Sequence, residues 1–352
     1  MHLSRTTALR LMLALLIGLA GGVWSAAAPL RAANDPLPPL AIQFTLDRPL
    51  DAAAAPFVMA AVGGLFSAEG LSVGTNIAPS SAEAIARVAD GSSDFALVDI
   101  NSLIRFRDTP HAAPVKAVFV LFNEAPYAII ARKSRGIKAL SDVQGKTLGV
   151  AEGDLSIRLW PAVAKLNGIK LGSVKQNSIS AAVREPMLSA GQVDAVTGFS
   201  YLSAINLRDR GVPADDLAVL RFADYGCEAY GFAVIVSPRL AAAKPDAVKG
   251  FVRALIGGTS LAIKDPARAA TEVVSRMDGG SLELEQARLR VIISDSILTG
   301  EVKRNGIGGI DPARFERAID QLAEDFKFQK RPHASDIFDE SFLPPRDDRL
   351  IN

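Results

Sequence analysis

The run FALV at residues 95–98 is the strongest indicator of fold class in this sequence. Four consecutive apolar residues are typical of a strand in a parallel sheet that is covered on both faces. A helix is predicted just before this run, because Ser80 and Glu83 have capping-box spacing and Gly91 suits a helix end. Residues 80–98 therefore indicate a helix followed by a buried parallel strand.

The same alternation extends in both directions from this segment. The predicted strands are residues 41–46, 71–77, 95–98, 115–122, 127–131, 146–151, 174–179, 194–199 and 230–237. The later predicted helices are residues 247–263, 267–277, 282–298 and 311 to about 326. Alternating strands and helices predict an α/β fold with parallel sheets, and the pattern restarts at residue 146. Two such runs indicate two α/β lobes.

The first 28 residues have the composition of a secretory signal peptide. Arg5 and Arg10 are followed by the apolar run LMLALLIGLA at residues 11–20 and by small residues suited to cleavage. The apolar run is short for a membrane span, which needs about 20 residues. We predict cleavage of this segment and a mature protein in the periplasm. An uncleaved N-terminal anchor is the alternative.

Composition excludes several classes of function. The 352 residues carry 39 basic and 38 acidic side chains, so no excess of positive charge predicts a nucleic-acid partner. Cys227 is the only cysteine, which excludes an internal disulfide and a cysteine-rich zinc site. No nucleophile elbow, phosphate-binding loop or zinc-protease motif is present. We expect no metal, no cofactor and no catalytic residues.

Candidate ligand-binding residues follow from the ends of the predicted strands. In an open α/β sheet the carboxyl ends of the strands line the crevice that binds ligands. The residues at these ends and in the neighbouring connections are Asp47, Arg48, Ser80, Ser81, Asp99, Asn101, Glu124, Tyr127, Gly153, Asp154, Trp160, Phe199 and Glu228. For Ser80 or Asp154 taken singly, simple helix capping is an equally good explanation.

The residue types in this set point to a class of ligand. Aromatic residues make up only 6% of the chain, yet Tyr127, Trp160 and Phe199 lie near predicted strand ends, where a flat ligand can stack on them. Burial in the core is the simpler alternative for such side chains. Acidic residues outnumber basic ones in the set, which favours a ligand with amino or ring N–H donors.

Five segments carry a resemblance to a known family. They are LDRPLDAAAAPFVMA at residues 46–60, GLFSAEGLSV at 64–73, ADGSSDFA at 89–96, GIKALSDVQGKTLGV at 136–150 and GQVDA at 191–195. With them the chain resembles periplasmic solute-binding proteins of ABC importers. The similar branch includes binders of alkanesulfonates, taurine, nitrate and thiamin-pyrimidine precursors. The resemblance extends over most of residues 40–330.

The resemblance implies a type II periplasmic-binding-protein fold, in which two mainly parallel, helix-flanked sheets form two lobes joined by two crossover strands. It implies a first lobe of residues 38–125 and 235–330, a second lobe of residues 126–234 and a C-terminal tail of residues 331–352. A small solute is then held between the lobes of a monomer and delivered to an inner-membrane ABC permease and its ATPase.

The solute and the activity remain open at this stage. A nitrogen-containing ring such as a pyrimidine precursor is our first expectation. The loop at residues 47–50 has neither the Trp nor the Asn that many pyrimidine binders show there, so an alkanesulfonate, taurine, nitrate or small aromatic acid is the alternative. Similar pyrimidine synthases use a histidine, a lysine-bound pyridoxal phosphate and a cysteine-rich iron motif. No His lies in the predicted pocket loops and Cys227 is alone, which disfavours an enzyme. The sensor domain of a signalling receptor is the third alternative. It needs a second membrane span, and no later stretch of the sequence is long and apolar enough to form one.

Overall fold

The computed structural model describes residues 38–351. The predicted signal peptide, residues 1–28, lies outside the described residues. Within residues 38–351, no helix combines the length and the apolar character needed to cross a membrane.

The first sheet has the strand order β2-β1-β3-β10-β4. Its strands are β1 (Leu40–Leu46), β2 (Leu71–Ile77), β3 (Phe95–Asp99), β4 (Lys116–Val120) and β10 (Phe232–Val236). β1 pairs in parallel with β2 and β3, whereas β10 is antiparallel to its neighbours β3 and β4. Four of the five strands therefore run in one direction, and β10 runs against them.

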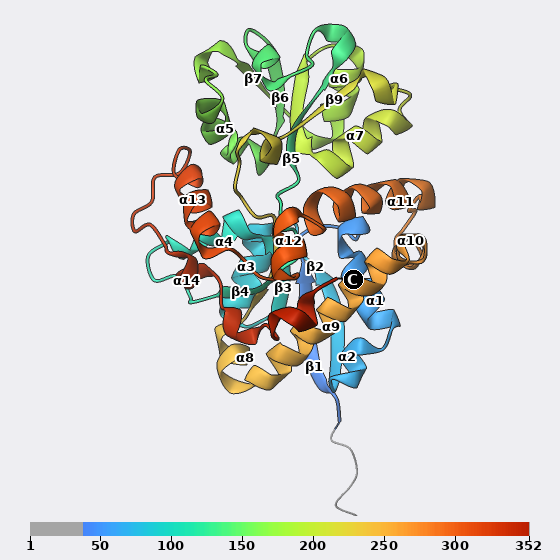
Figure 1. Cartoon of the computed structure of the whole chain (residues 1–352), viewed down its shortest axis with the longest axis vertical. Coiled ribbons are helices and arrows are strands. Elements are labelled where there is room, and N and C mark those ends of the chain that lie inside the picture. The colour runs from blue at the N-terminus through green and yellow to red at the C-terminus, as the bar shows by residue number, and fades with distance from the viewer. Residues whose placement is uncertain (1–37, 352) are drawn as a thin grey trace, which may run out of the picture. The chain divides into compact units, whose positions relative to one another are not determined.

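The second sheet repeats this arrangement with the order β7-β6-β8-β5-β9. Its strands are β5 (Tyr127–Arg132), β6 (Thr147–Ala151), β7 (Lys175–Ile179), β8 (Ala195–Phe199) and β9 (Leu217–Arg221). Here β5 is the antiparallel strand, between β8 and β9. In Figure 1 the green and yellow middle of the chain forms this sheet, whereas the blue N-terminal and orange C-terminal parts combine around the first. The predicted α/β fold with two mainly parallel, helix-flanked sheets is confirmed.

Helices flank both sheets. They are α1 (Ala55–Val62), α2 (Leu65–Ala68), α3 (Ser81–Asp90), α4 (Ile100–Arg107), α5 (Trp160–Leu166), α6 (Arg184–Ala190), α7 (Ser200–Asp209), α8 (Pro238–Ala243), α9 (Pro245–Lys264), α10 (Pro266–Val274), α11 (Leu282–Val291), α12 (Gly300–Asn305), α13 (Pro312–Leu322) and α14 (Ala334–Ile337). The helix predicted at residues 282–298 is α11 followed by one π-helical turn, Ile292–Ile297. α13 starts where Asp311 caps it, as expected, but ends at Leu322 rather than near residue 326.

Aromatic stacking joins helix α9 to the first sheet. Phe251 of α9 lies on Phe95 of β3 with ring centroids 4.0 Å apart and planes 8° apart. Phe44 of β1 stacks on Phe57 of α1 at 4.1 Å. These buried rings attach α1 and α9 to one face of the sheet, because aromatic side chains bury large apolar areas.

Two connections link the sheets, after β4 and after β9, and they lie side by side. The backbone N–H of Ala125 donates to the carbonyl of Ala229 at 3.2 Å, and that of Gly231 donates to the carbonyl of Phe122 at 2.9 Å. A Cβ on Gly231 would lie 2.9 Å from the Cβ of Phe122, so only glycine permits this approach. The two connections thus form a hydrogen-bonded pair that places the start of β5 beside the first sheet.

The polar C-terminal segment is also part of the fold. Ile337 in α14 is fully buried, and Phe338 forms a parallel bridge with Ala117 in β4. Phe342 is buried as well. A few apolar residues in a polar stretch therefore hold this segment against the edge of the first sheet.

Candidate functional site

The carboxyl ends of β1 and β3 bring two buried carboxylates to one serine. Asp47 follows β1, Asp99 ends β3, and they are 4% and 0% exposed. The hydroxyl of Ser81, at the start of α3, donates to the Asp47 carboxylate. The backbone N–H of Asp99 donates to the same hydroxyl oxygen at 3.1 Å. The parallel strands thus gather three predicted site residues, because their carboxyl ends lie at one edge of the sheet.

Asn101 and Tyr127 complete this network. The Tyr127 hydroxyl donates to Asp99, and the Asn101 backbone N–H donates to Asp99 Oδ1 at 2.8 Å. Asn101 Nδ2 donates to the Tyr127 hydroxyl at 3.0 Å and to the Tyr230 carbonyl at 2.9 Å. Asn101 Oδ1 is buried and accepts no hydrogen bond from any described residue. Both hydrogen bonds of Nδ2 go to acceptors, which determines how the amide group is oriented. Oδ1 is therefore available to accept a hydrogen bond from an N–H or O–H donor.

Burial changes the proton affinity of two groups in the network. It raises the pKa of Asp99 to about 6, although hydrogen bonds from Tyr127 and Asn101 favour the charged form. Burial and the adjacent Asp99 also raise the pKa of the Tyr127 hydroxyl well above its ordinary value. Tyr127 therefore acts as a neutral hydrogen-bond donor.

Arg48 lies between Asp47 and two aromatic rings. Its Nε and Nη2 donate to Asp47 Oδ1 and Oδ2 at 2.7 and 2.9 Å. Its guanidinium carbon is 3.9 Å from the centre of the Phe232 ring and 5.3 Å from that of Phe199. Burial alone would lower the pKa of Arg48, but the Asp47 carboxylate raises it above the ordinary value. Arg48 is therefore a charged, flat group in a corner formed by two rings.

An aromatic wall surrounds this corner. Phe199, at the end of β8, has ring centroids 6.0 Å from Tyr127, 5.9 Å from Tyr201 and 5.8 Å from Phe232. Phe122 lies 6.1 Å from Tyr201. Phe199 belongs to β8 of the second sheet, Tyr201 to the following helix α7 and Phe232 to β10 of the first sheet, so the wall contains side chains from both halves of the protein.

The structure brings seven of the thirteen predicted site residues into one cluster. They are Asp47, Arg48, Ser81, Asp99, Asn101, Tyr127 and Phe199. We refer to this set as the strand-end cluster. Phe232 and Tyr201 were not among the predicted site residues. Phe232 begins a strand, and only the antiparallel insertion of β10 beside β3 brings it to the carboxyl ends of the other strands.

Two predicted residues lie at the strand ends of the second sheet. Asp154 accepts from the backbone N–H of Ser156 at 2.9 Å and from the Thr197 hydroxyl at 2.6 Å, and its carboxylate is 3.7 Å from Arg184. Gly153 forms an exposed turn with φ of +75°. Asp154 is therefore fully engaged by its own half of the protein, and its partners Thr197 and Arg184 were not predicted.

The other four predicted residues have partners outside the strand-end cluster. Ser80 is exposed and caps α3, accepting from the Glu83 N–H at 3.3 Å. Trp160 is fully buried with its ring 6.3 Å from that of Phe222. In the connections between the sheets, Glu124 lies 3.9 Å from Arg221, and Glu228 pairs with Arg317 at 2.6 Å. We do not include these residues in the site proposed below.

A second polar network connects α11 with α7. Glu285 Oε2 accepts from the Ala52 backbone N–H at 2.7 Å, and Arg288 donates to Glu285 and, at 2.7 Å, to Asn206 Oδ1 in α7. Burial raises the pKa of the neighbouring Asp51 to about 6. This network was not predicted from the sequence, since its members lie far apart in the chain.

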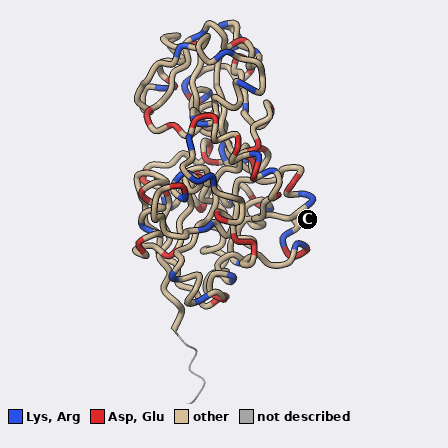
Figure 2. Tube along the Cα trace, turned by 90° about the vertical axis from the view of Figure 1, so that its left-hand side faces the viewer, with Lys and Arg blue, Asp and Glu red and all other residues tan. Residues whose placement is uncertain are grey.

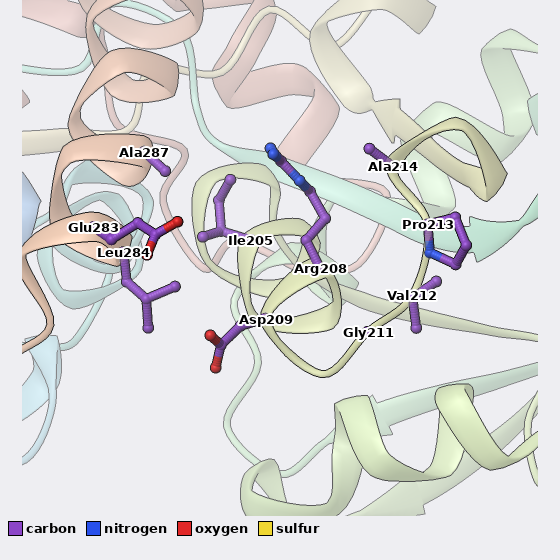
Figure 3. Close-up of a pocket in the computed structure, with 10 residues that line it drawn as sticks. All are labelled: Ile205, Arg208, Asp209, Gly211, Val212, Pro213, Ala214, Glu283, Leu284 and Ala287. Carbon is purple, nitrogen blue, oxygen red and sulfur yellow. The ribbon is translucent and has the colours of Figure 1, made fainter.

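Among residues 38–351, two cavities lie between the part of the chain around the first sheet and the part around the second. A cavity of about 440 Å³ between α7 and α11 is lined by Ile205, Arg208, Asp209, Gly211, Val212, Pro213, Ala214, Glu283, Leu284 and Ala287 (Figure 3). Beside the strand-end cluster, the gap between Asp99, Asn101 and Leu155 has only about 10 Å³. That is roughly the space of one water molecule.

Charged side chains and potential metal ligands are dispersed over residues 38–351. Figure 2 shows acidic and basic residues interspersed along the chain. Among residues 38–351, no group of three or more His, Cys, Asp or Glu side chains is arranged to hold a metal ion. Cys227 is buried, and burial raises the pKa of its thiol to about 11, so it is a poor nucleophile near neutral pH.

Two proteins with established names are similar to this chain in sequence. One relative is the 4-amino-5-hydroxymethyl-2-methylpyrimidine phosphate synthase of Legionella pneumophila, 28% identical over 156 residues, which are 44% of this chain and 49% of the relative. Another is the riboflavin-binding protein RibY of Chloroflexus aurantiacus, 27% identical over 248 residues and 67% of each chain. The matches thus span about half of the first relative and two thirds of the second.

Solved structures support the fold independently. The periplasmic aliphatic sulphonate binding protein SsuA of Escherichia coli superposes with a TM-score of 0.68 at 15% identity, covering 85% of this chain and 92% of that one. The profile of the family described as NMT1/THI5 like matches residues 51–269. The resemblance found in the sequence is confirmed, and the chain belongs to the NMT1/THI5-like family, with an α/β fold similar to that of periplasmic binding proteins.

Proposed function

We propose that this protein is the extracytoplasmic solute receptor of an ABC importer and that it captures a small nitrogen-containing ring at the strand-end cluster. The solute is released unchanged to an inner-membrane permease, which works with an ATPase. The receptor acts as a periplasmic monomer after removal of residues 1–28.

The free acceptor on Asn101 carries this proposal. Its Oδ1 is buried beside Asp99 and lacks a donor among the described residues, and a buried polar atom without a partner costs about 1–3 kcal/mol. A ring N–H or an amino group supplies that donor. Asp47 and Asp99 add two buried carboxylates that favour the same kind of solute.

The aromatic wall suits the flat part of such a solute. Phe199, Tyr201 and Phe232 line the corner around Arg48, and offset or edge-to-face packing with a ring is favourable by about 0.5–1.5 kcal/mol beyond the buried area. The names of both relatives, a pyrimidine phosphate synthase and a riboflavin-binding protein, also refer to nitrogen-containing rings.

Capture requires movement of two lobes. We assign residues 38–125 and 235–330 to the first lobe, 126–234 to the second and 331–352 to the tail. The gap of about 10 Å³ beside Asn101 is too small for a ring, so the lobes must separate before a solute enters. The paired connections around Ala125 and Ala229 are the natural hinge, because they alone carry the chain from one sheet to the other.

An anionic solute is the second candidate. Arg48 is a bidentate donor of the kind that binds sulfonates, and the Escherichia coli structural neighbour is named as a sulphonate binder. Against this, both carboxylate oxygens of Asp47 already neutralise Arg48. A synthase activity, as the name of the Legionella relative suggests, is the candidate from another class.

Isothermal titration and thermal shift against pyrimidines, flavins, alkanesulfonates and nitrate test the proposal. We expect a ring compound with N–H donors to bind, and Asn101→Ala to weaken it by about tenfold, as expected for one lost hydrogen bond near 1.4 kcal/mol. Asn305→Ala, at an exposed asparagine that ends α12, is the matched control. Binding of sulfonates alone would contradict the proposal. Mass spectrometry of the recovered compound separates a receptor from an enzyme.

A further inference from the structure

The guanidinium of Arg48 has the contacts expected of a bound ligand. It is a flat cation whose two adjacent N–H groups donate to both oxygens of Asp47, at 2.7 and 2.9 Å. One of its faces lies 3.9 Å from the centre of the Phe232 ring. Carboxylate pairing at the edge combined with an aromatic ring on the face is a general way to bind a planar cation.

The surroundings of Arg48 are more rigid than Arg48 itself. Asp47 is 4% exposed and also accepts from Ser81, and Phe232 is 1% exposed within a strand. The Arg48 side chain is 22% exposed and lies in a loop that continues with Pro49. A long side chain on a loop can change rotamer, whereas Asp47 is held by the hydrogen bond from Ser81 and Phe232 by its strand.

A second carboxyl group is available to Arg48 outside this position. Asp51 lies three residues further along the chain and interacts electrostatically with Arg48. The other charged groups near Asp51 are Glu285 and Arg288, which pair with one another. Arg48 therefore retains an acidic neighbour when it leaves Asp47.

We propose that Arg48 is a built-in competitor that occupies a flat-cation subsite formed by Asp47, Phe199 and Phe232. A solute whose edge presents two neighbouring N–H donors in one plane, as an amidine or a protonated aminopyrimidine does, displaces the guanidinium and takes over its contacts. This inference rests on the proposed function and adds to it the chemical class of the solute edge and a residue that sets the affinity.

Competition predicts the direction of the effect of removing Arg48. The apparent affinity for a solute is reduced by the fraction of molecules in which the subsite is occupied by Arg48. If Arg48 occupies it in about nine molecules of ten, Arg48→Ala increases the affinity about tenfold. If Arg48 instead contacts the solute directly, the same substitution weakens binding.

Methylguanidinium is the probe, because it reproduces the end of the arginine side chain and contains no ring. Calorimetry and melting temperature are measured for wild type, Arg48→Ala, Arg48→Lys and Arg253→Ala at millimolar probe. Methylurea, its neutral counterpart, is measured in parallel. We expect binding of methylguanidinium to Arg48→Ala at least tenfold tighter than to wild type, an intermediate affinity for Arg48→Lys, and no gain for Arg253→Ala, an exposed arginine of α9 that pairs with Glu69.

The outcomes separate this inference from the proposed function. Equal affinity of wild type and both Arg48 variants for methylguanidinium would overturn the competitor role. Weaker binding of ring compounds by Arg48→Ala than by wild type would also overturn it while leaving the receptor function intact. Tight methylguanidinium binding by Arg48→Ala, with no ring compound bound by any variant, would support the subsite and refute the proposed function. Arg48→Lys keeps a positive charge beside Asp47. Its affinity for methylguanidinium therefore still tests the competitor role if Arg48→Ala does not fold.

Discussion

The buried carboxyl of Asp99 makes the stability of this protein depend on pH in an unusual direction. Its pKa is about 6 in the folded protein and 3.8 in an unfolded chain, so the folded state binds the proton more tightly. Between these two values the folded state carries more protons than the unfolded state, and the free energy of unfolding falls as the pH rises. The loss is complete once the pH is above the folded pKa.

The size of the effect follows from the shift. About two pKa units at 1.36 kcal/mol per unit correspond to about 3 kcal/mol in total, of which about 2 kcal/mol is lost between pH 4 and pH 7. Asp99→Asn removes this dependence, because an amide has nearly the same shape and does not titrate in this range. The carboxamide oxygen still accepts from the Asn101 N–H, and the amide can donate to the Tyr127 oxygen.

Urea unfolding of wild type and Asp99→Asn at several pH values between 4 and 7.5 measures the difference directly. We expect the variant to gain about 2 kcal/mol relative to wild type across this range. Asp216→Asn is the control. Hydrogen bonds, first that from the Ser134 backbone N–H and then that from the Arg132 side chain, lower the pKa of Asp216 to about 2, so this carboxyl titrates below the pH range of the experiment. A difference between wild type and Asp99→Asn that stays constant from pH 4 to pH 7.5 would refute the reasoning.

Three further changes test neighbouring parts of the structure. Tyr127→Phe removes the hydroxyl that donates to Asp99, so we expect a loss of about 1–3 kcal/mol at pH 7 that shrinks when Asp99 is protonated at pH 4, measured by urea unfolding. Gly258→Ala places a Cβ 2.1 Å from a backbone oxygen of α1, and we expect a clear fall in melting temperature, from a cost of about 1–3 kcal/mol or more; an unchanged melting temperature would contradict the observed contact between α1 and α9. Thr197→Val removes a donor to Asp154 and should cost about 1–3 kcal/mol in calorimetry, whereas a neutral result would show that Asp154 does not need that hydrogen bond.

Signals that lie close together in the chain predicted their elements well. Ser80 and Gly91 enclose α3, with the Ser80 hydroxyl on the Glu83 N–H and Gly91 at φ of +81°, as the capping pattern indicated. Such features depend on hydrogen bonds within one or two turns, so residues a few positions apart determine them. The apolar run of β3 was recognised for the same reason.

Elements stabilised by distant partners were predicted poorly. β9 (Leu217–Arg221) was not identified, because five residues at a sheet edge show little periodicity, and the strand forms through its pairing with β5. The helix predicted through residue 298 gives way to a π-helical turn, and no local residue pattern marked that change. For β9, pairing with a strand far away in the sequence outweighs local preference.

The site shows the same division between local and distant information. The rule that ligands bind at strand ends named seven members of the strand-end cluster, because the parallel strands β1 and β3 end at the same edge. It also named Trp160, which is buried on Phe222, and Glu228, which pairs with Arg317. Nearness to a strand end along the chain does not determine the direction in which a side chain points.

Local residue patterns were thus sufficient for the fold class, the helix starts and the acidic and aromatic residues available at the strand ends. Only the folded chain shows that β10 returns between β3 and β4, which places Phe232 beside Arg48, and that Tyr127 from the other sheet donates to Asp99. The reason is physical. Hydrogen bonding within a turn acts over a few residues, whereas strand order and side-chain contacts result from packing the whole chain around its cores.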